Sequence, residues 1–150
     1  MPQALDSILL HLVFSTKHRE PCLDAAVRPA LHAYLATLVR DTGCLCPRVG
    51  GVADHVHLAV KLSRTTTVAA LVEHIKTESS KWLKRQSPAL AGFAWQRGYG
   101  VFSVSPDGLD RLVAYIDGQE AHHAGRDWPS EYRALLDRHG VAYDERYVWD

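Results

Sequence analysis

The fold of this chain is decided by the stretch Asp54-His55-Val56-His57-Leu58-Ala59-Val60. Successive side chains on a β-strand point to opposite faces, so this alternation puts the two histidines on one face and the valines and the leucine on the other. A glycine-containing turn at residues 50–54 precedes it, which predicts a hairpin of two strands over residues 44–51 and 55–62. We therefore expect a sheet with one apolar face and two imidazoles on the opposite face.

The segments on either side of this hairpin complete an α+β pattern. An apolar run at residues 7–14 predicts a buried strand, and Asp24 caps a helix with apolar residues at helical spacing. Thr67 caps a second, longer helix that ends before Pro88, and residues 93–104 are β-prone. The order β-α-β-β-α-β predicts a ferredoxin-like (split βαβ) antiparallel sheet with helices on one face.

Two further helices are expected after the sheet. The segment Ser105-Pro106-Asp107 starts a helix over about residues 106–123, on which Tyr115 and Gln119 are surface neighbours at i and i+4. A last helix, roughly residues 130–139, is followed by an acidic and aromatic tail, so that the C-terminal helix and tail together take up about 128–150. The predicted tyrosine helix therefore lies outside the split βαβ unit.

Composition limits the class of protein. A chain of 150 residues is long enough for one core and too short for two ordinary domains, so we expect residues 1–150 to form a single domain. No apolar run approaches the roughly twenty residues of a membrane span, and the first residues lack the pattern of a secretory signal. We therefore expect a cytoplasmic protein without membrane contact. Three cysteines, with Cys44-x-Cys46 lacking a second pair, predict reduced structural thiols.

Charge is balanced overall but unevenly distributed. The formal net charge of zero argues against strong nonspecific binding to duplex nucleic acid. Residues 1–104 hold twelve Lys or Arg and seven acidic residues, whereas residues 105–150 hold five and ten. A nucleic-acid surface, if present, is expected on the first two thirds of the chain.

Spacing alone leaves the histidines and the tyrosine open to ordinary structural roles. Two histidines at i and i+2 on a strand can offer ring nitrogens to one cation. With nine histidines in the chain, however, such a pair arises by chance on the order of half the time. A tyrosine beside an apolar stripe is usually a core-edge residue.

The ordered motifs of the whole chain narrow these alternatives, because together they resemble the HUH single-tyrosine transposases of the two-hundred-type insertion sequences. The resemblance runs from about His11 to the C-terminus. In chain order, the matching segments are His11-Leu12-Val13-Phe14-Ser15-Thr16-Lys17, Asp54-His55-Val56-His57-Leu58, Lys76-Thr77-Glu78-Ser79-Ser80-Lys81-Trp82, residues 93–105, Tyr115-Ile116 with Gln119-Glu120, His122-His123, and Asp144-Glu145-Arg146-Tyr147-Val148-Trp149.

This resemblance implies a set of roles. His55, His57 and Gln119 would bind a divalent metal, Mg²⁺ or Mn²⁺, and Tyr115 would be the nucleophile that forms a 5′-phosphotyrosine. Tyrosine has a pKa near 10, so it is a poor nucleophile until a cation polarises the phosphate and stabilises the leaving 3′ oxygen. The resemblance also implies single-stranded DNA with hairpin ends as substrate, and a homodimer in which the tyrosine helix of one subunit serves the histidines of the other.

Five basic residues are DNA-binding candidates. Lys17 and Arg19 follow the first strand, Lys76 and Lys81 lie on the long helix, and Arg97 lies in the aromatic-rich segment. A solvated surface charge is an equally good explanation for each of them.

Several alternatives remain open from the sequence. Asp54 could orient a histidine ring or merely make the turn, and Gly118 could loosen the tyrosine helix or mark a decayed copy. A domesticated relative that binds hairpin DNA without turnover would keep the same fold. A small ferredoxin-like metal-binding domain unrelated to DNA is a third hypothesis. A replication or plasmid-transfer nickase is a fourth, although such nickases are generally larger proteins.

Overall fold

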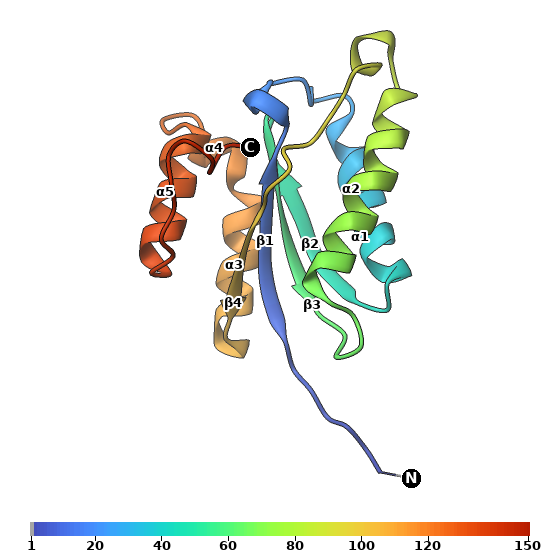
Figure 1. The fold of residues 1–150 in the computed structure, drawn as a ribbon, viewed down its shortest axis with the longest axis vertical. Coiled ribbons are helices and arrows are strands. Elements are labelled where there is room, and N and C mark those ends of the chain that lie inside the picture. The colour runs from blue at the N-terminus through green and yellow to red at the C-terminus, as the bar shows by residue number, and fades with distance from the viewer. Residues whose placement is uncertain (1) are drawn as a thin grey trace.

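A four-stranded antiparallel sheet carries helices on both faces in the computed structural model, which describes residues 2–150 (Figure 1). The strands are β1 (Leu9–Ser15), β2 (Leu45–Gly51), β3 (His55–Lys61) and β4 (Gly100–Val104), in the spatial order β2-β3-β1-β4. Helix α1 (Arg28–Asp41) connects β1 to β2, and α2 (Val68–Lys84) lies between β3 and β4. The predicted α+β, ferredoxin-like fold is therefore confirmed.

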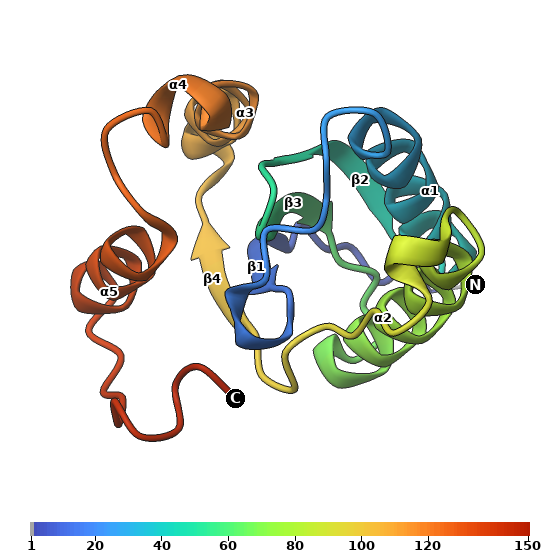
Figure 2. The same ribbon diagram turned by 90° about the horizontal axis from the view of Figure 1, so that it is seen from above.

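One face of the sheet packs against α1 and α2 and forms the main apolar core (Figure 2). The inward residues of β3 are Val56, Leu58 and Val60, as the alternation predicts, and all are at most 1% exposed. Helix α2 begins where the Thr67 side chain accepts a hydrogen bond from the backbone N–H of Ala70, which satisfies one of the free donors of its first turn. This layer makes β3 a rigid support for the residues on its other face.

The opposite face of the sheet is covered by the C-terminal helices. These are α3 (Leu109–Asp117), the short α4 (Gln119–His122) and α5 (Trp128–Arg138) (Figure 2). Helix α3 contacts β2 and β3, while α5 packs on Val13 of β1 and Phe102 of β4. The histidines of β3 therefore lie under helices rather than on an open sheet surface.

Three elements differ from their predicted extents. The helix expected over 106–123 is interrupted at Gly118, which ends α3 before α4 begins. The last strand begins at Gly100 rather than near residue 93. The segment before Gly100 makes only one isolated bridge to the sheet, between Thr16 and Trp95, and is otherwise not paired as a strand. The last helix starts at Trp128 rather than 130, since the Asp127 side chain accepts from the N–H of Ser130 and caps it.

The helices, the cysteines and the C-terminal tail each have a property that bears on the class of protein. None of the helices within residues 2–150 is long and apolar enough to cross a bilayer. The three cysteines are free thiols packed with the α1 and α2 core, as predicted. The carbonyl of Asp150 accepts the N–H of Gly98 at 2.8 Å, which fastens the tail beside the end of β1.

Candidate active site

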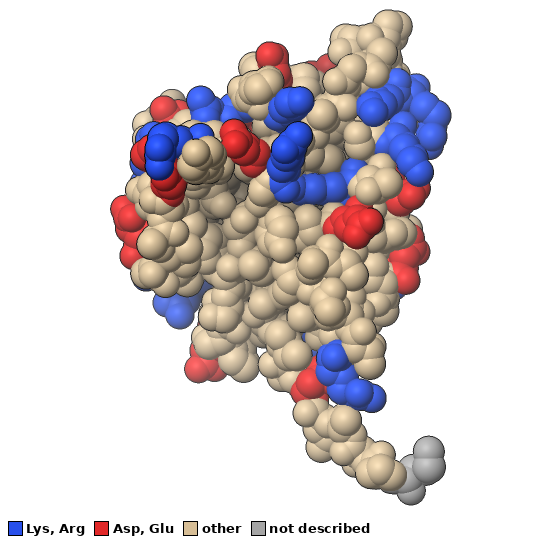
Figure 3. Space-filling view, viewed as in Figure 1, with Lys and Arg blue, Asp and Glu red and all other residues tan. Residues whose placement is uncertain are grey.

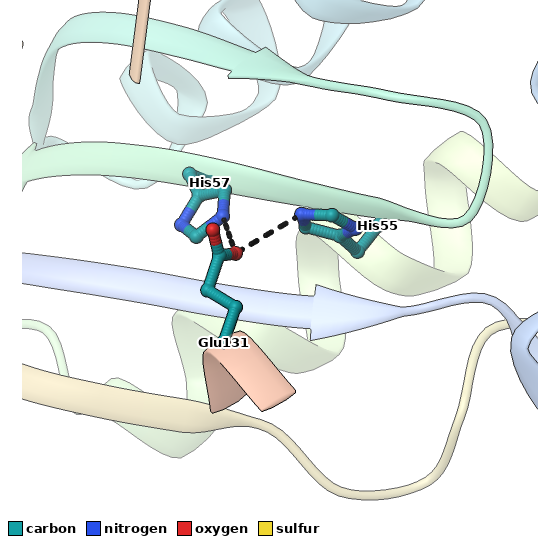
Figure 4. Close-up of side chains that lie close together, drawn as sticks. All are labelled: His55, His57 and Glu131. Atoms are coloured by element: carbon teal, nitrogen blue, oxygen red, sulfur yellow. Dashed lines mark hydrogen bonds and ion pairs between the residues drawn. The ribbon is translucent and has the colours of Figure 1, made fainter. Parts of the chain in front are cut away.

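His55 and His57 point from β3 toward one carboxylate, that of Glu131 on α5 (Figure 4). The Nε2 atoms of the two histidines lie 3.3 and 2.9 Å from the same Glu131 oxygen, Oε1. Both histidines are 0% exposed and Glu131 is 2% exposed. Two imidazole nitrogens and a carboxylate oxygen thus converge in a place without water access.

The other ring nitrogens of both histidines have partners of their own. His55 Nδ1 lies 2.7 Å from Asp54 Oδ1, and His57 Nδ1 lies 2.7 Å from His11 Nε2. Because an ionised carboxylate only accepts, His55 Nδ1 carries a proton and donates to Asp54. Asp54 therefore orients the ring. Metal-binding histidines are usually held by a carboxylate or carbonyl in this way. His11 likewise holds the His57 ring through its Nδ1 atom, a role that no sequence pattern predicted.

Burial sets the protonation of this group. Burial lowers the pKa of His57 to about 4, and burial together with His57 lowers the pKa of His11 to about 3. For His55, burial opposes the charged form, but hydrogen bonds to Asp54 and Glu131 outweigh it and raise the pKa. At neutral pH the His57 ring is therefore neutral and can offer its nitrogen lone pair to a cation.

Gln119 contacts His55 directly after the interruption at Gly118. A Cβ at Gly118 would lie 3.3 Å from the carbonyl oxygen of Ala114, a tight contact that glycine avoids. Beyond this break, Gln119 is 1% exposed, with Oε1 3.0 Å from His55 Nε2 and Nε2 donating to Glu131 Oε2 at 3.3 Å. The predicted partner of the histidines is thus in contact with His55.

Glu131 is the site residue that sequence reasoning missed. It lies on the buried stripe of α5 with Trp128, Tyr132 and Leu135, and the Trp128 ring stacks on the His55 ring with centroids 4.2 Å apart. Burial would raise the pKa of Glu131, but hydrogen bonds from His55 and His57 hold it far below its ordinary value. An acidic residue at i+3 from a buried tryptophan, inside an apolar stripe, was the available signal.

Tyr115 lies on the last turn of α3, against the same group. Its ring meets the His57 ring edge-on at a centroid distance of 5.4 Å and lies 6.0 Å from that of His11. Burial, and then the neighbouring Glu131 carboxylate, raises the pKa of the Tyr115 hydroxyl above its ordinary value, while Gln119 opposes this shift. A single chain therefore brings the predicted nucleophile beside its own histidines.

The donor atoms are spaced for a divalent cation. Two ligands at right angles on a cation with bonds of about 2.1 Å lie about 3 Å apart. The spacings of His55 Nε2 from Gln119 Oε1, and of His57 Nε2 from Glu131 Oε1, are 3.0 and 2.9 Å. Imidazole, amide and carboxylate donors are ligands of Mn²⁺, and the oxygen donors also suit Mg²⁺. This His/Glu group could bind a divalent metal.

Comparison with known proteins identifies the family. A family model described as transposase IS200 like matches residues 4–119, which include both histidines, Tyr115 and Gln119. The chain belongs to the IS200-like transposase family. Glu131 lies beyond the matched residues. No match was found among the curated proteins.

Two solved structures share the fold of this IS200-like transposase. One is a crystal structure of a protein assigned as a transposase from Deinococcus radiodurans R1, with 23% identity and a TM-score of 0.60, covering 79% of this chain and 98% of the other. The second is a REP-associated tyrosine transposase bound to a REP hairpin, with 14% identity and a TM-score of 0.62, covering 96% and 90%.

Three of the five basic candidates of this IS200-like transposase gather beside the end of β1. Lys17 and Arg97 line a hollow together with Trp149, and the Arg19 guanidinium lies over the Trp149 ring at 4.9 Å. His18 and Arg19 have φ of 58° and 57°, left-handed conformations that cost roughly 1 kcal/mol or more each and cluster at functional sites. Figure 3 shows Lys and Arg gathered at this end of the molecule.

The other two candidates are placed differently. Lys76 donates to the backbone carbonyls of Gln96, Arg97 and Gly98 at 2.8, 3.2 and 2.7 Å, and burial lowers its pKa to about 8. It therefore holds the segment that presents Arg97. Lys81 is exposed on α2, 3.6 Å from Glu78, and is not among the residues that line the hollow.

Proposed function

We propose that this chain is a metal-dependent transposase that cleaves and rejoins single-stranded DNA at insertion-sequence ends through a 5′-phosphotyrosine at Tyr115. The observation that carries the proposal is the convergence of Tyr115, the paired histidines and Gln119 from β3, α3 and α4 around one buried polar group. An ordinary core-edge tyrosine would pack on apolar side chains, whereas Tyr115 lies against His57, Gln119 and Glu131.

His55, His57 and Gln119 would hold the metal, Mg²⁺ or Mn²⁺, and Glu131 is placed to add a carboxylate oxygen. When bound, the cation supplies positive charge to the scissile phosphate and to the leaving 3′ oxygen. Asp54 and His11 would keep the two imidazoles in the orientation that this requires. Tyr115 would attack the phosphorus as the 3′ oxygen leaves, and the covalent link lets another 3′ hydroxyl reverse the step.

Single-stranded DNA with hairpin ends is the partner that we propose. The hollow beside β1 combines Lys17 and Arg97, which can neutralise phosphates, with Trp149, which can stack on a base. The similar fold of a transposase bound to a REP hairpin supports the same class of ligand. A homodimer is also proposed, although Tyr115 and His57 of one chain already meet, so that sharing of the tyrosine helix between subunits is not required.

The test mixes the protein with labelled hairpin DNA from the ends flanking its own gene, in Mn²⁺ or Mg²⁺, and looks for a denaturant-resistant adduct. We expect an adduct that is lost with chelator and in Tyr115→Phe. Tyr34→Phe is the matched control, since Tyr34 packs on Trp82 in the other layer. Hairpin binding without any adduct would favour a domesticated binding protein, and an adduct that persists in Tyr115→Phe would refute the assignment of the nucleophile.

A further inference from the structure

A second group of ring nitrogens faces the other oxygen of the same carboxylate. Oε1 of Glu131 meets His55 and His57, whereas Oε2 lies 2.9 Å from His122 Nε2 and 3.0 Å from His123 Nε2. His122 is the last residue of α4 and His123 follows it, and both lie beyond the residues that the family model covers. Their side chains are 29% and 10% exposed, so this side of the carboxylate is nearer to solvent.

The hydrogen bonds of His123 repeat the pattern seen at His55. His123 Nδ1 lies 2.5 Å from the carbonyl oxygen of Arg126, which can only accept, so Nδ1 carries the proton. His123 Nε2 lies 3.0 Å from Glu131 Oε2, so the second ring nitrogen is directed at the carboxylate. His55 shows the same arrangement, with Nδ1 on Asp54 and Nε2 facing acceptor oxygens. In both cases one ring nitrogen is held by an outer acceptor and the other is directed at Glu131, which is the arrangement usual for metal-binding histidines.

His122 adds an independent observation. Its Nε2 atom is buried and has no hydrogen-bond partner in this structure, although Glu131 Oε2 lies only 2.9 Å away in a direction that does not suit a hydrogen bond. An unpaired buried nitrogen is unfavourable, because it has lost its hydrogen bonds to water without gaining another partner. A metal bond from that nitrogen satisfies it without hydrogen-bond geometry.

From these contacts we propose a second divalent-cation site, formed by His122 Nε2, His123 Nε2 and Glu131 Oε2, with Glu131 bridging it to the His55 and His57 site. Carboxylate-bridged pairs of cations lie about 3.5–4 Å apart, which a single bridging carboxylate can span. Two imidazoles and one carboxylate oxygen favour Mn²⁺, Co²⁺ or Zn²⁺ over Mg²⁺, which prefers oxygen ligands. The His122 ring also lies 5.6 Å from that of Tyr115, so the second cation would sit beside the nucleophile.

The experiment measures Mn²⁺ stoichiometry on the chelator-stripped full chain, by titration calorimetry and by electron paramagnetic resonance of the free ion. Mn²⁺ is used because it binds the three free thiols weakly. We expect two ions per wild-type chain. His123→Ala and His122→Ala should each weaken one binding event by about tenfold or more, and Glu131→Gln should weaken both.

His74→Ala is the matched control, because that histidine lies on α2 beside Asp41 and should leave both ions bound. The resonance of two ions bridged by one carboxylate should also be broadened, and His123→Ala should restore the signal of an isolated ion. One ion per wild-type chain, or two tight ions in the His122→Ala, His123→Ala double variant, overturns the proposal. No DNA enters this assay, so its failure leaves the test of Tyr115 untouched.

Discussion

Gly50 on β2 fixes the position of the helix that carries Tyr115, and Gly50→Ala should displace it. A Cβ at residue 50 would lie 2.6 Å from Ile116 Cγ2 and 2.8 Å from the Ile116 carbonyl oxygen. Carbon atoms pack at about 3.5–4.0 Å, so α3 must move away from β2 by roughly 0.5–1 Å. Because Tyr115 precedes Ile116, the nucleophile moves with the backbone.

This displacement is expected to lower both activity and stability. A misplacement of about 1 Å in a catalytic group can cost on the order of 100-fold in rate. Overpacking a tight contact costs about 1–3 kcal/mol, which lowers Tm by roughly 2–12 °C in a domain of this size. The rate of adduct formation with hairpin DNA and the thermal midpoint of the same preparation provide the two measurements.

Gly92→Ala is the matched control, since a Cβ there has no atom within 4 Å. It should change neither quantity appreciably. A Gly50→Ala variant with the wild-type adduct rate would show that the β2 to α3 contact does not position the tyrosine, and would refute the reasoning.

Three further outcomes are expected. His11 has a lowered pKa of about 3, so the unfolded chain takes up the proton first as pH falls through about 6.5, and stability decreases. This contributes roughly 2 kcal/mol between pH 7 and pH 5, and urea unfolding of His11→Gln should show a smaller loss over that interval. Asp54→Asn should weaken Mn²⁺ binding about 10-fold or more in calorimetry, whereas Asp41→Asn should not. Lys76→Met should lower the free energy of unfolding by about 2 kcal/mol in urea, because three carbonyls lose their charged donor, while Lys84→Met should have little effect.

Local periodicity explains which parts could be predicted from the chain alone. Alternation along β3 was sufficient to place both histidines on one face, since that pattern depends only on neighbouring residues. Gln119 is the i+4 neighbour of Tyr115, as the spacing predicts, and the two side chains share a hydrogen bond although Gly118 separates α3 from α4. Its contact with His55 depends instead on how α4 lies against the sheet.

The remaining contacts depend on how distant elements pack. Glu131 lies on a helix whose position is set by Trp128 and by β4, and no spacing rule links it to residues more than seventy positions earlier. Lys76 is a second example. A lysine on the outer face of an amphipathic helix is expected to be solvated, but the Lys76 ammonium group donates to three carbonyls of one loop. Both depend on tertiary structure that periodicity does not encode.

The stacking of Trp128 on His55 gives the protein an optical signal of its own. The indole is 1% exposed, and it stacks on the imidazole with ring centroids 4.2 Å apart and an angle of 19° between the ring planes. Its emission therefore depends on the charge state of the His55 ring. A cation or a proton arriving at His55 changes the quenching of this fluorophore, whereas Trp82 and Trp95 belong to the other layer and Trp149 packs on Tyr132. Occupancy can thus be followed in real time without a label attached to protein or nucleic acid.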